Sequence, residues 1–389
     1  MPKICGITTK SNTIAAFMLK PFNALAAKGF DCYVISNPDK DSRITEKSLG
    51  KVKHIVVDIK WGFMTPFQLT KTVCKLYKVF KKEKFDIIQY ATMNAALCSS
   101  IAGWMAKVPV RINLLWGLDY LMYKGWKRAL YYTSTKLICK LSTHVQPDSK
   151  GNLQFGKEIG LFDEKKGGMV YNGSACGLDL QKFDINKREE WRKETRKEVG
   201  LEKYEKVFGF VGILNFDKGI DEMLQAFMKL GRSDAALVLV GGLDKTYTLK
   251  QEVLEKAKQQ SNIYFLGRKN NPEKYFACFD FHVLSSYAEG FGMVVLEAAG
   301  MGTPSIITNI KGPTDLIKDN VNGFVCEPKS VDSLLKAMQR ALTISPKEYD
   351  RLAKNAHDMA KKDYDSNVFL EKYVENRIEL YNSIKKNRI

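Results

Sequence analysis

The chain has 389 residues, a length that suggests two domains or one large one. Apolar residues make up 45% of it and charged residues 27%, so wholesale disorder is excluded. Its eight cysteines form no Cys-x-x-Cys pair and its four histidines are scattered, which excludes a small disulfide scaffold and leaves no zinc motif. We expect a soluble globular protein with free thiols, no bound metal and no cofactor.

Two stretches of the sequence bear on where in the cell the protein resides. The amino terminus offers no secretory signal, because Lys3 and Lys10 bracket only six residues. Residues 87–106 are uncharged over 20 residues, the length of a spanning helix, but they include several polar side chains. We expect a strand followed by a buried helix there, and a cytoplasmic protein.

The positive charge lies mostly in the first half. Residues 1–170 carry 27 Lys and Arg against 12 Asp and Glu, a net charge of +15, whereas residues 171–389 carry 34 against 31, a net charge of +3. Four lysines share one face of a predicted helix: Lys71, Lys75, Lys78 and Lys82. A second basic and aromatic cluster contains Lys124, Trp126, Lys127 and Arg128. Such clusters suit an anionic membrane surface; the alternative for either helix alone is an ordinary solvated face.

The first half alternates strands with helices. Strands are expected at residues 3–8, 32–35, 54–59, 85–90 and 110–115. A helix is expected over residues 15–27, ended by Gly29. This alternation predicts a parallel, doubly wound sheet.

The second half repeats the alternation. Strands are expected at residues 206–214, 236–240, 263–266, 281–284 and 304–308. Helices are expected at 219–230, 248–260, 271–278, 293–300, 331–343, 346–361 and 368–384. The fold class is therefore α/β, with two tandem Rossmann-like domains facing a cleft. The expected division is 1–168, 169–364 and a terminal helix, 365–389, packed back on the first domain.

The most informative motif opens the helix at residue 293. Gly290 and Gly292 would let backbone N–H groups approach a phosphate, and Glu289 and Glu297 lie eight residues apart. Two carboxylates at that spacing can meet two sugars of one elongated ligand, which indicates a nucleotide sugar. The alternative is a strand–helix turn with surface acids.

A second loop lies between the strand at 206–214 and the next helix. It contains Gly212 and, at the start of the helix, Lys218, whose ammonium group can neutralise a diphosphate. A third strand-to-helix loop covers residues 308–315.

Taken in order, these motifs resemble the retaining GT-B-fold glycosyltransferases of family 4. "EGFGMVVLEAAGMGTPSI" matches that family's E-x7-E signature, and "FVGILNFDKGIDEMLQAF" resembles its G-R-L…K-G element. "VYNGSACGLDLQKF" is similar to the element that joins the two domains. The similarity covers residues 170–364. The first half looks like members that build bacterial surface polysaccharides, such as capsule and lipopolysaccharide, and lipid-linked glycans.

The resemblance implies a role for each site residue. Glu289 would contact the donor hexose and, with Lys218, form the catalytic pair, while Lys218 neutralises the leaving diphosphate. Glu297 would bind the ribose. The remaining donor-binding positions would be Gly212, Arg268 near the base, and the backbone of Gly290, Phe291 and Gly292.

Two positions depart from the family pattern. Ile213 stands where an arginine is usual, so one of two cations on the diphosphate is missing. Loss of such a contact can cost about 3 kcal/mol of transition-state stabilisation, a hundredfold or more in rate. A histidine usual after the fourth strand is also absent, and the four histidines are expected to be structural.

We therefore expect transfer of a hexose or N-acetylhexosamine, with retention, from a nucleotide sugar with UDP as the expected nucleotide. The expected acceptor is a polyprenyl-diphosphate-linked sugar at the inner membrane face, in bacterial polysaccharide or glycan assembly. Three alternatives stay open: a nucleotide-sugar epimerase of the same fold, an inactive GT-B-like protein, and a nucleic-acid-binding protein. No nucleic-acid motif appears, so we expect no nucleic-acid partner.

Overall fold

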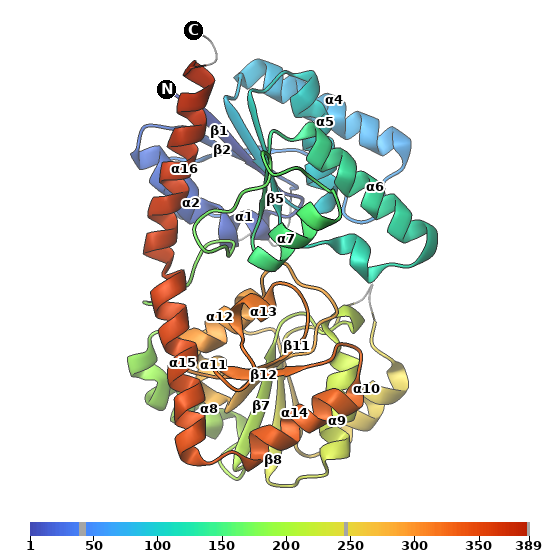
Figure 1. The fold of residues 1–389 in the computed structure, drawn as a ribbon, viewed down its shortest axis with the longest axis vertical. Coiled ribbons are helices and arrows are strands. Elements are labelled where there is room, and N and C mark those ends of the chain that lie inside the picture. Colours follow the sequence, from blue (N-terminus) through green and yellow to red (C-terminus); the bar gives the residue numbers. More distant parts are fainter. Residues whose placement is uncertain (39–43, 245–247, 387–389) are drawn as a thin grey trace. The chain divides into compact units, whose positions relative to one another are not determined.

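The computed structural model describes residues 1–38, 44–244 and 248–386 (Figure 1). The chain divides into two compact units. The first contains residues 1–177 together with 367–389, and the second contains residues 178–366. Each unit holds one six-stranded sheet whose strand pairs are parallel, so the α/β fold with two Rossmann-like halves is confirmed.

The first sheet has the strand order β3-β2-β1-β4-β5-β6. Its strands are β1 (Lys3–Ile7), β2 (Asp31–Ser36), β3 (Lys53–Val56), β4 (Ile87–Tyr90), β5 (Val110–Leu115) and β6 (His144–Pro147). Side chains alternate between the two faces, so that Ile4 enters one hydrophobic core and Cys5 the other. Both faces are apolar because helices cover each of them.

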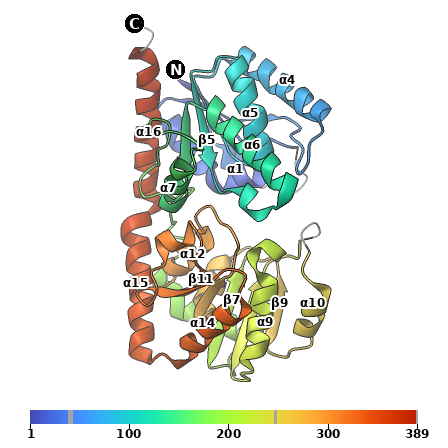
Figure 2. The ribbon, with the colours of Figure 1, turned by 45° about the vertical axis from the view of Figure 1, so that its right-hand side comes forward.

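Helices cover both faces of this sheet (Figures 1 and 2). One layer contains α1 (Ser11–Phe17), α2 (Leu19–Ala27) and α16 (Ser366–Lys386). The other contains α4 (Pro66–Glu83), α5 (Met93–Met105) and α6 (Gly125–Leu141). The short helices α3 (Glu46–Leu49) and α7 (Lys150–Glu158) lie in connections. From α16, Phe369 and Ile384 join the core formed by α1 and α2.

The single helix expected over residues 15–27 is wrong. The structure has two helices that meet at Met18, whose φ of −116° departs from helical values. The physical reason is Pro21, which has no N–H to donate to the carbonyl of Phe17 and whose ring crowds that carbonyl. Gly29, with a φ of +87°, follows the end of α2 as expected.

The second sheet has the order β12-β11-β10-β7-β8-β9. Its strands are β7 (Lys206–Val211), β8 (Ala235–Val240), β9 (Ile263–Gly267), β10 (Phe281–Leu284), β11 (Ser305–Thr308) and β12 (Gly323–Cys326). The chain runs from β7 outward to β9 and then returns to the other side of β7 with β10. The loops after β7 and β10 therefore leave adjacent strands in opposite directions, the arrangement at which parallel sheets bind ligands.

Helices of the second unit form two contacting series. One contains α8 (Arg188–Val199), α11 (Pro272–Cys278), α12 (Met293–Gly300) and α15 (Pro346–Tyr364). The other contains α9 (Ile220–Leu230), α10 (Gln251–Lys258) and α14 (Val331–Thr343), and the short α13 (Pro313–Leu316) follows β11.

Some elements differ from the sequence expectations. The helix expected over 248–260 spans only α10, and β6 and α8 were not predicted. Strand β6 has one aliphatic residue in four, and α8 is so rich in charge that it shows almost no apolar stripe. Within the described parts of the chain, no helix is long and apolar enough to span a membrane.

Candidate active site

Two loops at the carboxyl edge of the second sheet bring Lys218 and Glu289 together. Lys218 ends a short 3-10 helix after β7, and Glu289 lies in the loop between β10 and α12. The Nζ of Lys218 lies 2.6 Å from Oε1 of Glu289. The two residues are 71 positions apart in sequence, and they meet because β7 and β10 are adjacent strands. The pair is partly buried, with 26% of the lysine side chain and 15% of the glutamate side chain exposed.

Close packing of the two loops requires a glycine after Lys218. Gly219 has a φ of +65°, and a Cβ placed on it would lie 2.1 Å from the carbonyl oxygen of Ser285. The hydroxyl of Ser285 donates to the carbonyl oxygens of Lys218 and Gly219, at 2.9 Å each. The backbone N–H of Tyr287 donates to the carbonyl of Asp217 at 2.8 Å. Backbone and side-chain bonds therefore fix one loop against the other.

The carboxylate of Glu289 is held from a second side. Ser286 Oγ donates to the same Oε1 atom at 2.7 Å, and Thr308 Oγ1 donates to the carbonyl of Ser286 at 2.6 Å. A carboxylate fixed by an ammonium and a hydroxyl has lone pairs left for further donors, such as sugar hydroxyls. This geometry suits an acceptor of hydrogen bonds with a defined orientation.

Glu297 lies on the second turn of α12 and has different charged neighbours from Glu289. It is half-buried, and burial raises its pKa to about 7; nearby Glu273 adds to this rise and Lys182 opposes it. Lys182 and Glu273 form an ion pair of 3.9 Å. The two glutamates of the motif therefore occupy separate electrostatic environments, and their binding to two parts of one ligand stays a prediction.

Residues 290–292, which follow Glu289, offer main-chain groups rather than side chains to a ligand. The side chain of Phe291 is buried, with its ring centroid 5.3 Å from that of Tyr364, so only its main chain can contact a ligand. Gly292 has a φ of +90° and immediately precedes α12. With Gly290 it forms the turn at the helix N-terminus, whose N–H groups suit phosphate oxygens.

The other predicted donor residues lie along the same edge. Gly212 follows β7, and its N–H donates to the carbonyl of Val240 at 2.9 Å. Arg268 is exposed at the end of β9, with β7 and β8 between it and β10, so it does not join the Lys218–Glu289 pair within the sheet order. Ile213 lies in the same loop as Lys218, and its apolar side chain is 55% exposed to solvent.

Sequence reasoning missed the residues that position the pair. Ser285, Ser286 and Thr308 had no assigned role, and Tyr287 Oη donates to Oε1 of Glu222, on α9, at 2.7 Å. The available signal was the run of hydroxyl residues just after β10, where polar groups end an apolar strand.

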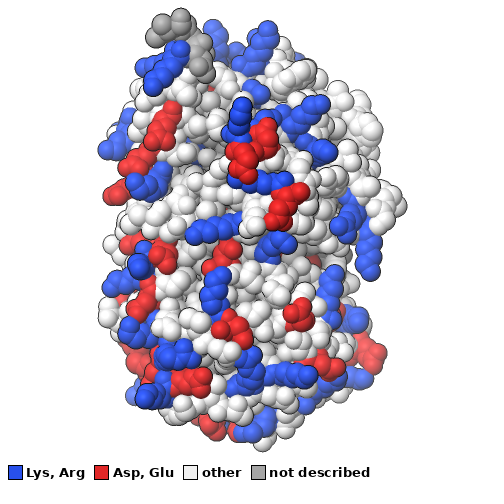
Figure 3. Space-filling model, viewed as in Figure 1, with Lys and Arg blue, Asp and Glu red and all other residues white. Residues whose placement is uncertain are grey.

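The basic positions of the first unit are exposed. All four lysines of the predicted α4 face, Lys71, Lys75, Lys78 and Lys82, point to solvent, whereas Val73, Leu76 and Phe80 are buried. At the start of α6, Lys124, Lys127 and Arg128 are exposed, and Trp126 is 68% exposed. On the face shown in Figure 3, by contrast, basic and acidic side chains are interspersed.

Comparison with known families matches each half separately. Residues 3–148 match the family "Glycosyl transferase 4-like", and residues 191–359 match "Glycosyl transferases group 1". The first match lies within the first unit and the second within the second unit.

Relatives along nearly the whole chain are bacterial glycosyltransferases. The capsular polysaccharide biosynthesis glycosyltransferase CapM of Staphylococcus aureus is 25% identical over 350 residues, 87% of each chain. The N,N'-diacetylbacillosaminyl-diphospho-undecaprenol alpha-1,3-N-acetylgalactosaminyltransferase of Campylobacter jejuni is 27% identical over 382 residues, 96% of this chain and 97% of the relative.

Solved structures share the fold. HepE of Anabaena in complex with UDP aligns with a TM-score of 0.77 at 18% identity, over 97% of this chain and 100% of that one. Sucrose-phosphate synthase of Thermosynechococcus elongatus aligns with a TM-score of 0.79 at 18% identity, over 98% and 100%. With both family matches in order and a Lys–Glu pair between the second sheet's central loops, the chain belongs to the GT-B-fold glycosyltransferases of family 4.

Proposed function

We propose that this glycosyltransferase moves a hexose or N-acetylhexosamine from a UDP-sugar to a lipid-linked sugar acceptor, with retention of configuration. The observation that carries the donor assignment is the 2.6 Å Lys218–Glu289 pair at the point where the sheet's connections diverge. A diphosphate is bound by a cation, and hexose hydroxyls are bound by a carboxylate of fixed orientation. The carboxyl edge of the second sheet holds both groups close enough together to bind one nucleotide sugar.

The reaction fits groups that orient and neutralise charge. The acceptor hydroxyl oxygen forms a bond to the anomeric carbon as the bond from that carbon to the diphosphate oxygen breaks. The departing diphosphate oxygen takes the hydroxyl proton, on the same face of the sugar. Lys218 stabilises the charge on the leaving group, and Glu289, held by Ser286, orients the hexose.

The acceptor assignment rests on relatives and on the basic first unit. The Campylobacter jejuni relative and an Escherichia coli relative, 26% identical over 355 residues, are both named for diphospho-undecaprenol-linked acceptors. A polyprenyl-linked sugar is presented at a membrane surface. The exposed lysines of α4 and the exposed Trp126 of α6 suit an anionic headgroup layer.

Transfer is tested with UDP-hexoses and UDP-N-acetylhexosamines against an undecaprenyl-diphosphate-linked sugar, with the product's anomeric configuration read by NMR. We expect an axial-to-axial, retained linkage and a loss of about hundredfold in kcat/KM in Lys218→Met. An inverted product would refute retention. Turnover without any acceptor would favour the epimerase alternative.

Peripheral membrane binding is tested by flotation with anionic and neutral vesicles. Each near-surface cation contributes about 1 kcal/mol, so reversing four charges on α4 to glutamate should abolish binding to anionic vesicles. Equal binding to neutral vesicles, or none to either, would refute the membrane proposal. The matched control reverses four exposed lysines of the second unit: Lys193, Lys197, Lys256 and Lys258.

A further inference from the structure

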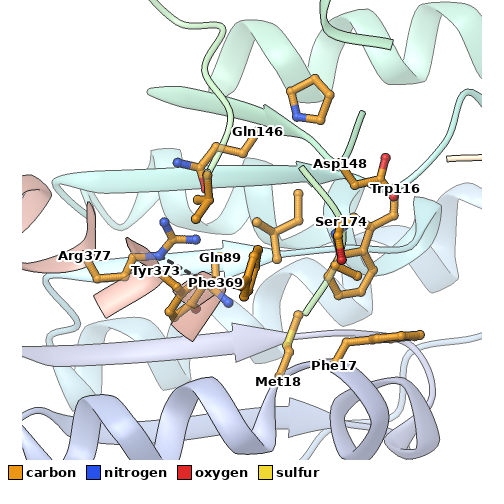
Figure 4. Close-up of a pocket in the computed structure, with 14 residues that line it drawn as sticks. Phe17, Met18, Gln89, Trp116, Gln146, Asp148, Ser174, Phe369, Tyr373 and Arg377 are labelled. Atoms are coloured by element: carbon orange, nitrogen blue, oxygen red, sulfur yellow. Dashed lines mark hydrogen bonds between the residues drawn. The ribbon is translucent and has the colours of Figure 1, made fainter. Parts of the chain in front are cut away.

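A pocket inside the first unit has a buried cation on its wall (Figure 4). The pocket lies between the ends of β5 and β6, the segment around Ser174, and α16. Its cavity volume is about 30 Å³, and it opens toward solvent. Figure 4 shows Arg377, Gln89 and Tyr373 on one side and Trp116, Ser174 and Asp148 on the other.

The guanidinium of Arg377 is fully buried and only partly satisfied. Its Nε donates to Oε1 of Gln89 at 3.0 Å, and its Nη1 donates to Oδ1 of Asn376. Its carbon Cζ lies 4.3 Å from the centre of the Tyr373 ring. Among the residues that the structure describes, Nη2 has no hydrogen-bond partner. Among the described residues, its hydrogen-bond acceptors are two amide oxygens and its ring contact is a phenol, so no counter-charge contacts it; the Asp148 carboxylate lies elsewhere on the pocket wall.

An unsatisfied acceptor lies on a neighbouring side chain. Gln146 donates from Nε2 to the same Asn376 Oδ1 at 3.2 Å, which assigns its other atom as the oxygen. That Oε1 atom is buried and has no partner within the described residues. Because Gln146 and Arg377 both donate to one oxygen atom, their head groups are close together. The pocket thus combines an unused cationic donor with an unused neutral acceptor.

A buried charge is costly unless it is paired, and a buried polar atom is costly unless it is hydrogen-bonded. Arginine binds carboxylate and phosphate oxygens more strongly than neutral acceptors. We propose that this pocket binds a small oxyanion bearing a hydroxyl group, whose carboxylate or phosphate oxygen accepts from Arg377 Nη2 and whose hydroxyl donates to Gln146 Oε1. The apolar walls, which include Phe17, Trp116 and Phe369, strengthen that attraction by excluding water.

The site touches both segments through which the chain passes between the units. The chain leaves the first unit after residue 177 and re-enters it at residue 367, and the pocket is lined by Ser174 on one segment and Phe369 on the other. A bound oxyanion would therefore order both connections at once. Hydrogen exchange should slow at residues 170–177 and 367–377 when the anion is present.

The test is calorimetric titration of the full chain with inorganic phosphate and with lactate, and with glycerol as the uncharged probe. The Lys218→Met protein is titrated in parallel, so that phosphate at the donor site does not contribute. We expect one-site binding of phosphate or lactate in both proteins and a loss of about tenfold or more in Arg377→Met. Arg351→Met, at an exposed arginine, is the matched control and should bind like the wild type.

Gln146→Leu keeps Arg377 but removes both the Oε1 acceptor and the bond from Nε2 to Asn376, so it tests the site even if Arg377→Met fails to fold. A few-fold loss of affinity, about fivefold, is expected. Phosphate binding without lactate binding would identify a phosphate site, and the reverse a hydroxycarboxylate site. The proposal is overturned if Lys218→Met binds neither, if Gln146→Leu or Arg377→Met binds as the wild type does, or if glycerol binds equally. UDP binding tests the donor site independently of all these outcomes.

Discussion

Replacing Glu289 with glutamine should tighten the binding of UDP while impairing sugar transfer. Lys218 Nζ lies 2.6 Å from Glu289 Oε1, so a diphosphate must compete with that carboxylate for the lysine. Two unit charges at this distance attract by about 6 kcal/mol at an effective dielectric constant of 20 and by about 1.6 kcal/mol in water. Lost hydration offsets most of this, and both side chains are partly exposed, which leaves a net attraction of about 1–2 kcal/mol.

That net attraction corresponds to about five- to thirtyfold tighter UDP binding in Glu289→Gln. Isothermal titration calorimetry with UDP, which lacks the hexose that Glu289 would hold, measures the effect. Lys218→Met should bind UDP weakly, and the double variant should match it, because the competing pair no longer exists. The gain should shrink at high salt. Unchanged or weaker UDP binding in Glu289→Gln, with weak binding in Lys218→Met, would refute the competition.

Three further predictions concern single positions. Burial raises the pKa of Glu297 to about 7, so the affinity for a UDP-sugar should rise as the pH increases through 7 and the carboxylate ionises. Calorimetric titrations from pH 5.5 to 8.5 measure this dependence, and Glu297→Gln should remove it. A UDP-sugar is the right probe, since its diphosphate has no ionisation in that range. Ile213→Arg should raise UDP affinity by about tenfold, because the exposed side chain can be lengthened toward the diphosphate without disturbing the core; an unchanged dissociation constant would place the phosphates elsewhere. Gly219→Ala should lower the free energy of unfolding, measured by urea denaturation, by about 2–3 kcal/mol, since its Cβ would lie 2.1 Å from a carbonyl oxygen. Gly29→Ala, in open space at a φ of +87°, should lower it by about 1 kcal/mol, and equal losses in the two variants would contradict this reasoning.

The sequence was most informative where local pattern and chemistry coincide. Residues 289–292 lie between a strand and a helix whose bounds were predicted closely, because β10 and α12 are predominantly apolar runs set between polar residues and glycines; Glu297 lies on that helix. The lysine face of α4 was predictable for the same reason, since a 3.6-residue period places charges and core residues on opposite sides.

Contacts between distant segments could not be predicted. The pairing of Lys218 with Glu289 depends on the adjacency of β7 and β10, which no local pattern encodes. Ser286 and Thr308 are ordinary strand-end hydroxyls until the sheet order brings them together. The bond from Arg377 to Gln89 joins residues 288 positions apart, and a lone arginine in a charged helix predicts a solvated side chain.

The discontinuity of the first unit constrains how this protein is made. Residues 1–177 emerge from the ribosome long before 367–389, yet α16 supplies Phe369, Val374 and Ile384 to the core that α1 and α2 share. Until those side chains arrive, the nascent first unit exposes an apolar face while the intervening unit can already fold by itself. A chain terminated before α16 would therefore have one folded unit and one unit with an exposed apolar face. Such a chain is a substrate for chaperones and proteases.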